Sequence, residues 1–291
     1  MVKNDSTTTV TSSANPSAWG QTVTFTATIT YTGPAPTGTV TFKKGSSTMG
    51  SGTVSGGKAT FATSTLAVGT YSITAVYAGD SNYGGSTSTA LSQVVDKANT
   101  STKVVSSVNP SDFDQTITFT ATVKAVAPGT GTPTGTVQFK DGATTMGSGA
   151  LSGGVAHYAT SNRTVGTHSI TAVYVASTDY NTSTSSPLSQ VVDEAATKTT
   201  VVSSLNPSAS GDTVTFTATV KSVAPGAGTP TGTVDFKDGA TLLGTHGLSG
   251  GVAAFATSKL AVGTHSITAV YVGNADYSTS KSGVLSQVVN P

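Results

Sequence analysis

The side chains of this chain that could do chemistry include acidic residues that recur beside tyrosines and between repeated segments. Five aspartates are candidate calcium ligands, three placed shortly before a recurring tyrosine and two in connecting segments: Asp80, Asp179, Asp276, Asp96 and Asp193. Calcium takes six to eight oxygen ligands, usually from several carboxylates. Because the 13 Asp and Glu residues are dispersed, turn formation, in which Asp bonds its own backbone, is favoured over calcium binding.

A second set of candidates consists of aromatic residues at one position of a repeated Gly-Thr-x-Ser-Ile-Thr-Ala-Val-Tyr segment. These residues are Tyr71, His168 and His265. The spacing is that of a tyrosine corner, in which the ring at the start of a strand bonds back across the preceding turn. An isolated histidine with no second ligand nearby is weak evidence for a metal or catalytic site. We therefore interpret all three as structural corner residues.

Glutamines at the same position of the last strand of each repeat are candidates for covalent cross-links. Gln93, Gln190 and Gln287 lie opposite Thr-rich first strands, and a Thr–Gln ester could join the two. Such chemistry needs a neighbouring acid or histidine to move protons, and none recurs in these strands. We expect a hydrogen bond from each amide to the backbone instead.

Trp19 is the only tryptophan, and the matching residues of the other repeats are Phe113 and Ser210. An exposed indole could stack on a sugar in one repeat. Packing of this loop aromatic on its own domain is the favoured alternative.

Enzyme motifs are missing from the sequence. It contains no phosphate-binding glycine loop before a helix, no nucleophile elbow, no His-Glu-x-x-His and no recurring acid–base pair of carboxylates. Charged residues are 9% of the chain and the net charge is +1, which gives no electrostatic attraction to nucleic acid or anionic membranes. We predict a protein without catalytic residues or cofactor, and without nucleic-acid binding or membrane insertion.

The elements that position these residues are repeated three times. Asn-Pro-Ser recurs at Asn15, Asn109 and Asn206, at spacings of 94 and 97 residues. Repeats of this length are domain-sized. We predict domains at residues 1–96, 97–193 and 194–291.

Within a repeat the hydrophobic period is two. Apolar residues alternate with threonines from Thr22 to Thr30, as in a strand with one buried face. Strands are expected in the first repeat at residues 6–13, 22–31, 38–44, 47–54, 58–65, 70–79 and 86–95. About seven strands in fewer than 100 residues predict an all-β fold of three tandem immunoglobulin-like sandwiches.

Three motifs carry a family resemblance. Pro-Thr-Gly-Thr-Val-x-Phe-Lys begins at Pro36, Pro133 and Pro230, the Gly-Thr-x-Ser segment follows in each repeat, and Tyr77–Tyr83 reads Tyr-Ala-Gly-Asp-Ser-Asn-Tyr. All three repeats resemble the bacterial immunoglobulin-like repeat family. The resemblance implies spacer or adhesion modules of large surface proteins or secreted enzymes, and it implies no catalytic residues. The second repeat reads Ala176 and Ser177 where the Gly-Asp of this signature would stand.

Composition and linkers bear on location and shape. The chain has 0 Cys and a Thr- and Ser-rich sequence without a visible signal peptide, so we expect a fragment of an extracellular or bacterial cell-surface protein whose export signal lies elsewhere. The linker at residues 94–104 contains neither Gly nor Pro, which predicts a joint of modest flexibility. Three sandwiches joined in this way would form a rod of roughly 100 to 120 Å.

The function predicted from these features is a structural spacer or stalk whose neighbours are other repeats of a longer parent chain. Two alternatives stay open, and the weak surface charge favours the first of them. One is homotypic assembly through edge strands into a filament or sheath. The other is an adhesin that binds a glycan or receptor of unknown identity.

Overall fold

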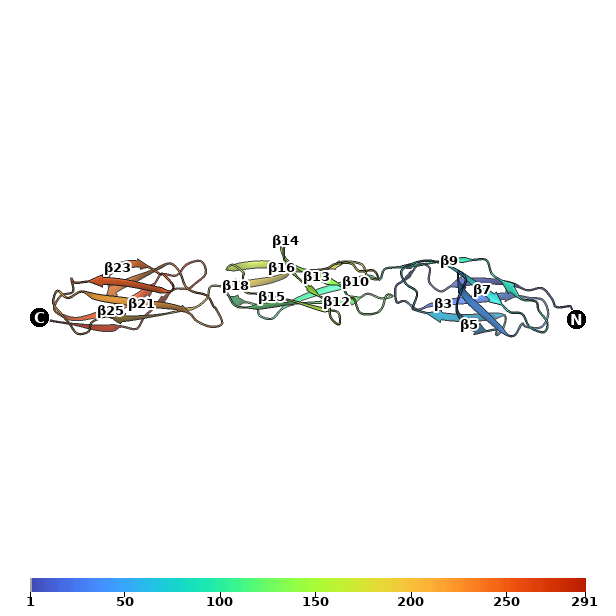
Figure 1. Ribbon diagram of the computed structural model, residues 1–291, viewed down its shortest axis with the longest axis horizontal. Helices are drawn as coiled ribbons and strands as arrows, with labels where there is room; N and C mark the ends of the chain where they lie inside the picture. Colours follow the sequence, from blue (N-terminus) through green and yellow to red (C-terminus); the bar gives the residue numbers. More distant parts are fainter. Residues whose placement is uncertain (1) are drawn as a thin grey trace.

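The computed structural model describes residues 2–291 and shows three similar units, here called copies 1, 2 and 3, that follow one another along one axis (Figure 1). Residues 2–291 form strands, turns and irregular segments without a helix. It follows that this part of the chain contains no helix that could cross a membrane. The two termini lie at opposite ends of the rod (Figure 1).

Each copy contains nine strands in two sheets. The strands of copy 1 are β1 (Thr7–Ser12), β2 (Ser17–Ala18), β3 (Val23–Thr30), β4 (Thr39–Lys44), β5 (Ser47–Thr53), β6 (Lys58–Thr63), β7 (Gly69–Tyr77), β8 (Ser86–Thr87) and β9 (Leu91–Asp96). One sheet has the order β1-β3-β6, and the other has the order β2-β9-β7-β4-β5 with β8 also paired to β7. All pairs are antiparallel except β2 with β9, which is parallel. This two-sheet arrangement is an immunoglobulin-like sandwich.

Copies 2 and 3 repeat this topology. The strands of copy 2 are β10 (Thr100–Ser106), β11 (Ser111–Asp112), β12 (Ile117–Ala125), β13 (Thr136–Asp141), β14 (Thr144–Ala150), β15 (Val155–Thr160), β16 (Gly166–Tyr174), β17 (Ser183–Thr184) and β18 (Leu188–Asp193). The strands of copy 3 are β19 (Thr197–Ser203), β20 (Ser208–Ala209), β21 (Val214–Ser222), β22 (Thr233–Asp238), β23 (Thr241–Gly247), β24 (Val252–Thr257), β25 (Gly263–Tyr271), β26 (Ser280–Lys281) and β27 (Leu285–Asn290).

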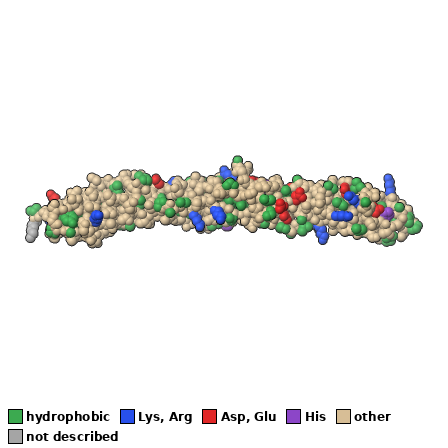
Figure 2. All heavy atoms as spheres, turned by 180° about the vertical axis from the view of Figure 1, so that it is seen from behind, with side chains coloured by type: hydrophobic (Ala, Val, Ile, Leu, Met, Phe, Trp, Pro, Cys, Tyr) green, Lys and Arg blue, Asp and Glu red, His purple; other side chains and the backbone are tan. Residues whose placement is uncertain are grey.

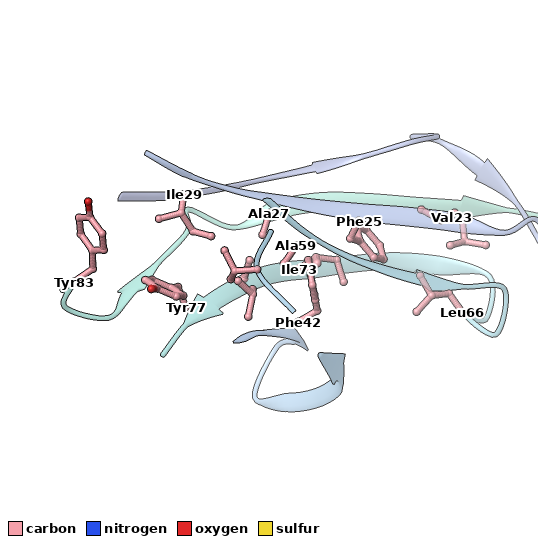
Figure 3. Close-up of a cluster of buried hydrophobic side chains, with 14 residues drawn as sticks. Val23, Phe25, Ala27, Ile29, Phe42, Ala59, Leu66, Ile73, Tyr77 and Tyr83 are labelled. Atoms are coloured by element: carbon pink, nitrogen blue, oxygen red, sulfur yellow. The ribbon is translucent and has the colours of Figure 1, made fainter. Parts of the chain in front are cut away.

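The core of each copy lies between its two sheets. In β3 the alternation puts Val23, Phe25, Ala27 and Ile29 inside, with at most 2% of each residue exposed, and directs the threonines outward. The buried side chains form a file along the copy, from Leu66 at one end to Tyr83 at the other (Figure 3). Equivalent clusters fill copies 2 and 3. Three tandem all-β, immunoglobulin-like sandwiches are therefore confirmed.

The last predicted strand differs from the observed one. Residues 86–95 were expected to form one strand, but the structure has β8 and β9 with a break between them. Buried Ser88 causes the break, because its backbone N–H donates to Ala75 O at 2.9 Å while its hydroxyl accepts from Ala75 N at 3.0 Å. Ser88 thus satisfies both the backbone N–H and the backbone C=O of Ala75, and the regular hydrogen-bonded pairing of the strands is interrupted at this position. The two-residue β2 was not predicted, because two residues carry no measurable alternation.

Candidate functional site: the two junctions between copies

The linker between copies 1 and 2 is part of the fold of copy 2. Ala98 is 0% exposed, its N–H donates to Asp179 O at 2.9 Å, and its carbonyl accepts from Asn181 N at 2.9 Å. Ala195 repeats this between copies 2 and 3, with Asp276 O at 2.9 Å and Ser278 N at 3.0 Å. Only a few residues at each joint are therefore outside a hydrogen-bonded strand or bridge.

An aromatic side chain spans the first joint, here called junction 1. The backbone N–H of Trp19 donates to Asp96 O at 2.8 Å, which fixes the loop after β2 to the end of β9. The indole packs against the cores of both copies. Its ring lies edge-on to that of Tyr180 in copy 2, with centroids 5.0 Å apart and an interplanar angle of 69°, a favourable aromatic geometry.

A loop of copy 2 completes junction 1. The Thr130 hydroxyl donates to Gly20 O at 2.8 Å, and Tyr180 Oη donates to Thr130 O at 3.1 Å. Burial is the first cause that raises the pKa of Tyr180, so this hydroxyl stays a neutral donor. One loop is thus bonded to the preceding copy and to the tyrosine beneath it.

Glycines make this close approach possible. Gly131 has a φ of +92°, and a Cβ atom there would lie 2.5 Å from Tyr180 Oη and 2.8 Å from the Trp19 ring. Gly20 has a φ of +77°, and its Cβ would lie 2.5 Å from Thr130 Oγ1. Side chains at either position would displace the loop from the preceding copy.

Junction 2, between copies 2 and 3, has the same plan with different residues. Phe113 lies edge-on to Tyr277 with centroids 5.4 Å apart at 77°, and Ala227 N donates to Phe113 O at 3.2 Å. Acidic side chains gather where copies 2 and 3 meet (Figure 2). Burial first, and then the Asp114 and Asp276 carboxylates, raise the pKa of Tyr277.

The two outer ends of the rod lack this arrangement. In copy 3 the residue equivalent to Trp19 and Phe113 is Ser210, which is exposed. In copy 1 the ring of Tyr31 lies edge-on to the buried Tyr83, with centroids 6.0 Å apart at 67°. The single O–H donor of Tyr83 is shared between two carbonyl acceptors, Thr32 O at 2.9 Å and Pro34 O at 2.7 Å. Copy 1 therefore covers its own tyrosine.

Asp80, the first of the candidate calcium ligands, is a turn residue in the structure. Its Oδ1 accepts from the N–H groups of Asn82 and Tyr83, both at 2.8 Å, and its Oδ2 accepts from Thr37 N at 2.8 Å and Thr37 Oγ1 at 3.1 Å. The Thr37 N–H is the first of the bonds that hold the pKa of this carboxyl well below its usual range. Both oxygens are already engaged by donors.

Asp179 and Asp276 do not occupy the position of Asp80. Ser177 and Asn274 do, and their side-chain oxygens accept the same turn N–H groups. Asp179 and Asp276 come directly before the tyrosine and contribute their backbone carbonyls to the linkers. The three aspartates that precede the tyrosines are therefore not equivalent in the structure, and the turn is closed by Asp, Ser or Asn, each a short polar side chain.

The linker aspartates also act through their backbone. Asp96 O and Asp193 O accept from the N–H groups of Trp19 and Phe113, each at 2.8 Å, while both residues are exposed. Within residues 2–291 no three His, Asp or Glu side chains gather closely enough to hold a metal ion.

The corner residues bond back across the turn before β7, β16 and β25. Tyr71 Oη donates to Ala67 O at 3.0 Å. His168 Nε2 lies 2.9 Å from Thr164 O, and its Nδ1 lies 2.7 Å from Asp141 Oδ2. Arg163 is 3.3 Å from the same carboxylate oxygen.

His265 makes the equivalent two contacts in copy 3, where Leu260 stands in place of Arg163. Its Nε2 lies 2.8 Å from Ala261 O and its Nδ1 lies 2.7 Å from Asp238 Oδ2. Because both partners are acceptors, only the doubly protonated ring donates to both. The bond to Ala261 O, followed by the one to Asp238, raises the pKa of His265.

The recurring glutamines donate to backbone carbonyls. Gln93 Nε2 lies 2.9 Å from Ala14 O and 2.9 Å from Val94 O. Gln190 and Gln287 make the equivalent bonds. Each amide nitrogen thus ties the loop before β2, β11 or β20 to the last strand, and within residues 2–291 none of these amides is hydrogen-bonded to a threonine of a first strand.

The junctions were the feature that sequence reasoning missed. Packing of Trp19 on its own domain, which the sequence favoured, is incomplete, because the indole packs against the core of copy 2 as well as that of copy 1. The signal was present as the unequal repeat length of 94 and 97 residues. Four residues, 32–35, connect Tyr31 to Pro36 in copy 1, where seven residues, 126–132 and 223–229, stand in copies 2 and 3. The three extra residues form the loop that reaches the preceding copy.

Similarity to a known protein family is found in each of the three copies. A family model described as a bacterial Ig-like domain (group 3) matches residues 10–96, 104–193 and 200–290. A search of characterised proteins by sequence found no match.

Solved structures with some similarity to this chain include two bacterial adhesins and a set of fibronectin(III)-like modules. FdeC, an adhesin of Escherichia coli, is 17% identical over 98% of this chain and 97% of that chain, with a TM-score of 0.31. A 1.5-MDa bacterial ice-binding adhesin is 18% identical over 99% of both chains, with a TM-score of 0.32. Fibronectin(III)-like modules of CbhA from Clostridium thermocellum are 20% identical over 65% of this chain and 94% of that chain, with a TM-score of 0.27.

Proposed function

The chain belongs to the bacterial Ig-like domain family of group 3, with one member in each copy, and from this premise we propose that it is a non-catalytic spacer. In this proposal the three copies form a stalk module of a large bacterial extracellular or cell-surface protein. The module holds whatever it carries at a distance from its point of attachment.

The observation that carries the proposal is the construction of the joints. Ala98 and Ala195 are 0% exposed and bonded into the following copy. A linker that belongs to the next sheet has few free backbone dihedrals, so neighbouring copies keep their mutual orientation better than copies joined by a Gly-rich linker. The end-to-end length of the array is then large for its number of residues, which is the property that a spacer needs.

The non-catalytic part of the proposal rests on how the reactive side chains are used. Asp80 accepts two hydrogen bonds from its own turn and two from Thr37 in a neighbouring loop, and both ring nitrogens of His265 face fixed acceptors. Groups held in this way are unavailable as nucleophile or base without breaking the local fold.

Small-angle X-ray scattering over a wide protein concentration series tests the spacer function. A stiff spacer gives the profile of a thin monomeric rod at every concentration. A profile of independently tumbling domains, with a broad distribution of end-to-end distances, would refute it. The location is tested separately by labelling intact source cells with an antibody against the purified chain, and labelling that requires lysis would exclude the cell surface.

A second candidate function is self-assembly into a filament, and the edge strands favour it. Strands β5, β14 and β23 end the larger sheet of each copy and pair on one side within residues 2–291. None of the three contains Lys, Arg, Asp or Glu, the residues that commonly guard sheet edges. In the same scattering series, mass that grows with concentration would replace the spacer by this alternative.

A further inference from the structure

The copies are nearly identical in their cores and differ at their poles, which are the two ends of each sandwich. The C-terminal pole presents residue 19, 113 or 210, here called the knob, and the N-terminal pole presents the pole tyrosine, Tyr83, Tyr180 or Tyr277. At each of the two junctions, the aromatic knob of one copy contacts the uncovered pole tyrosine of the next copy. At the outer pole of copy 1 the pole tyrosine, Tyr83, is covered by Tyr31, and at the outer pole of copy 3 the knob is Ser210 instead of an aromatic residue.

We propose that the poles specify which copies can be neighbours. The N-terminal pole accepts a preceding copy when it has the seven-residue loop, and it is closed when it has the four-residue loop with Tyr31 over Tyr83. The C-terminal pole makes the joint only when its knob is aromatic. This inference rests on the proposed spacer function and adds to it that the three copies form one stiff block bounded by poles that do not make this joint.

The loop length determines whether the N-terminal pole is open. In copies 2 and 3 the loop carries the groups that bond the preceding copy, namely Thr130 to Gly20 and Ala227 to Phe113. In copy 1 the shorter loop instead places Thr32 O and Pro34 O on the Tyr83 hydroxyl. Tyr31, which is Ala125 and Ser222 in the other copies, packs at 67° against Tyr83, the pole tyrosine with which a knob would have to pair.

The knob determines the other half of the joint. Backbone geometry at this position is conserved among the copies, since Trp19, Phe113 and Ser210 each donate their N–H to the end of the last strand at 2.8 or 2.9 Å. Only the side chain differs. A copy placed after Ser210 would therefore find the knob loop in place but no ring to set against its tyrosine, and it would lose an aromatic contact of the kind that orients both existing joints.

The first experiment transfers the closed pole of copy 1 into junction 1. In the closed-pole variant, residues 125–132 of the full chain are replaced by the residues found at 31–35. Copy 1 itself folds with this loop, so copy 2 should keep its fold. We expect Trp19 fluorescence to shift to longer wavelength and become open to acrylamide, and the scattering profile to change from a rod to a jointed chain.

A matched control makes the reverse exchange at the outer pole. Replacing residues 31–35 with those of 125–132 opens the pole of copy 1, where this chain supplies no preceding copy. Trp19 fluorescence and the scattering profile should stay as in the unaltered chain. Unchanged Trp19 burial in the closed-pole variant, with copy 2 folded, would overturn the proposal, and so would an equal change in the control.

Point variants keep the proposal testable if the loop exchange unfolds copy 2. Trp19→Phe reproduces the knob of junction 2 and should leave the scattering profile rod-like, while Trp19→Ser reproduces the outer pole and should loosen it. Equal profiles for the two variants would overturn the role of the knob. If the unaltered chain is itself flexible, the spacer function fails, whereas a stiff chain that ignores these exchanges refutes the pole rule alone.

Discussion

Phe119→Ala in β12 offers a test of both the core and junction 1. Phe119 is 0% exposed in the centre of the copy 2 core. Truncation of a fully buried Phe to Ala costs about 3 to 5 kcal/mol, a large part of the roughly 5 to 15 kcal/mol that stabilises a domain. At about 4 to 8 °C per kcal/mol for a domain of this size, copy 2 should melt roughly 12 to 40 °C earlier.

Trp19 should report this transition although it belongs to copy 1. Its ring lies 5.0 Å from that of Tyr180, and unfolding of copy 2 removes this partner and the loop above it. An aromatic pair contributes about 0.5 to 1.5 kcal/mol beyond the area it buries, which is small beside the stability of a whole domain. Copy 1 should therefore stay folded while Trp19 emission shifts to longer wavelength. The assay is thermal unfolding followed by tryptophan fluorescence and circular dichroism in parallel.

Phe216→Ala is the matched control, because Phe216 has the same position and the same 0% exposure in copy 3. It should produce an equally early transition by circular dichroism, but Trp19 should not respond, since copy 3 does not touch it. The reasoning is refuted if the early transition of Phe119→Ala is silent in tryptophan fluorescence, or if both variants give the same fluorescence change.

Three further predictions follow from single residues. Gly20→Ala should expose Trp19 to acrylamide, because the new Cβ would lie 2.5 Å from Thr130 Oγ1. The control is Gly211→Ala, which has a similar positive φ but no atom within 4 Å of the new Cβ. It should cost only the backbone penalty of about 1 to 2 kcal/mol and leave acrylamide quenching of Trp19 unchanged. The pKa of His265 is raised in the folded state by its bonds to Ala261 O and Asp238. The stabilisation that the protonated ring provides is therefore fully present below pH ~6.5 and is lost as the pH rises through the folded-state pKa. The melting temperature of copy 3 should fall over this pH range, and an equal fall in His265→Gln would contradict the assignment. Asp80→Ala should destabilise copy 1 because it leaves the turn N–H groups without an acceptor, and Asp80→Asn, which reproduces the residue of copy 3, should restore most of the loss in chemical denaturation; failure of that rescue would mean that the charge of Asp80 matters rather than its hydrogen bonds.

The sandwich could be predicted from the sequence because its signals are local. The alternation in residues 22–30 defines a strand and its buried face without reference to any other segment, and the structure puts Phe25 and Ile29 where that pattern places them. The break at Ser88 could not be predicted, since it depends on Ala75 in the neighbouring strand. A hydrogen bond between two strands does not change the alternation of apolar and polar residues in either strand.

The junctions depend on contacts between residues that are even further apart in the sequence. Trp19 and Tyr180 are separated by 160 residues of chain, and each has an unremarkable local context, one in a loop after a short strand and the other after a turn. Their pairing is decided by the loop at 126–132, which the sequence displays only as three extra residues relative to copy 1. In a tandem array, differences between copies therefore carry information that the shared motifs do not, because the shared residues specify the domain and the variable ones specify its neighbours.

Residues that vary together also occur within a single copy, at the corner position and the charged residue beside it. Copy 1 has Tyr71 with Lys44 Nζ 4.9 Å from the ring centroid, an attraction between a cation and an aromatic face. Copy 3 has a histidine at the first position and Asp238 at the second, 2.7 Å apart. Each ring is thus matched to the charge beside it, although the two positions lie 27 residues apart in the sequence. A change of one partner alone would set His against Lys or Tyr against Asp, so these positions are coupled in pairs, just as knob and loop are coupled across a junction.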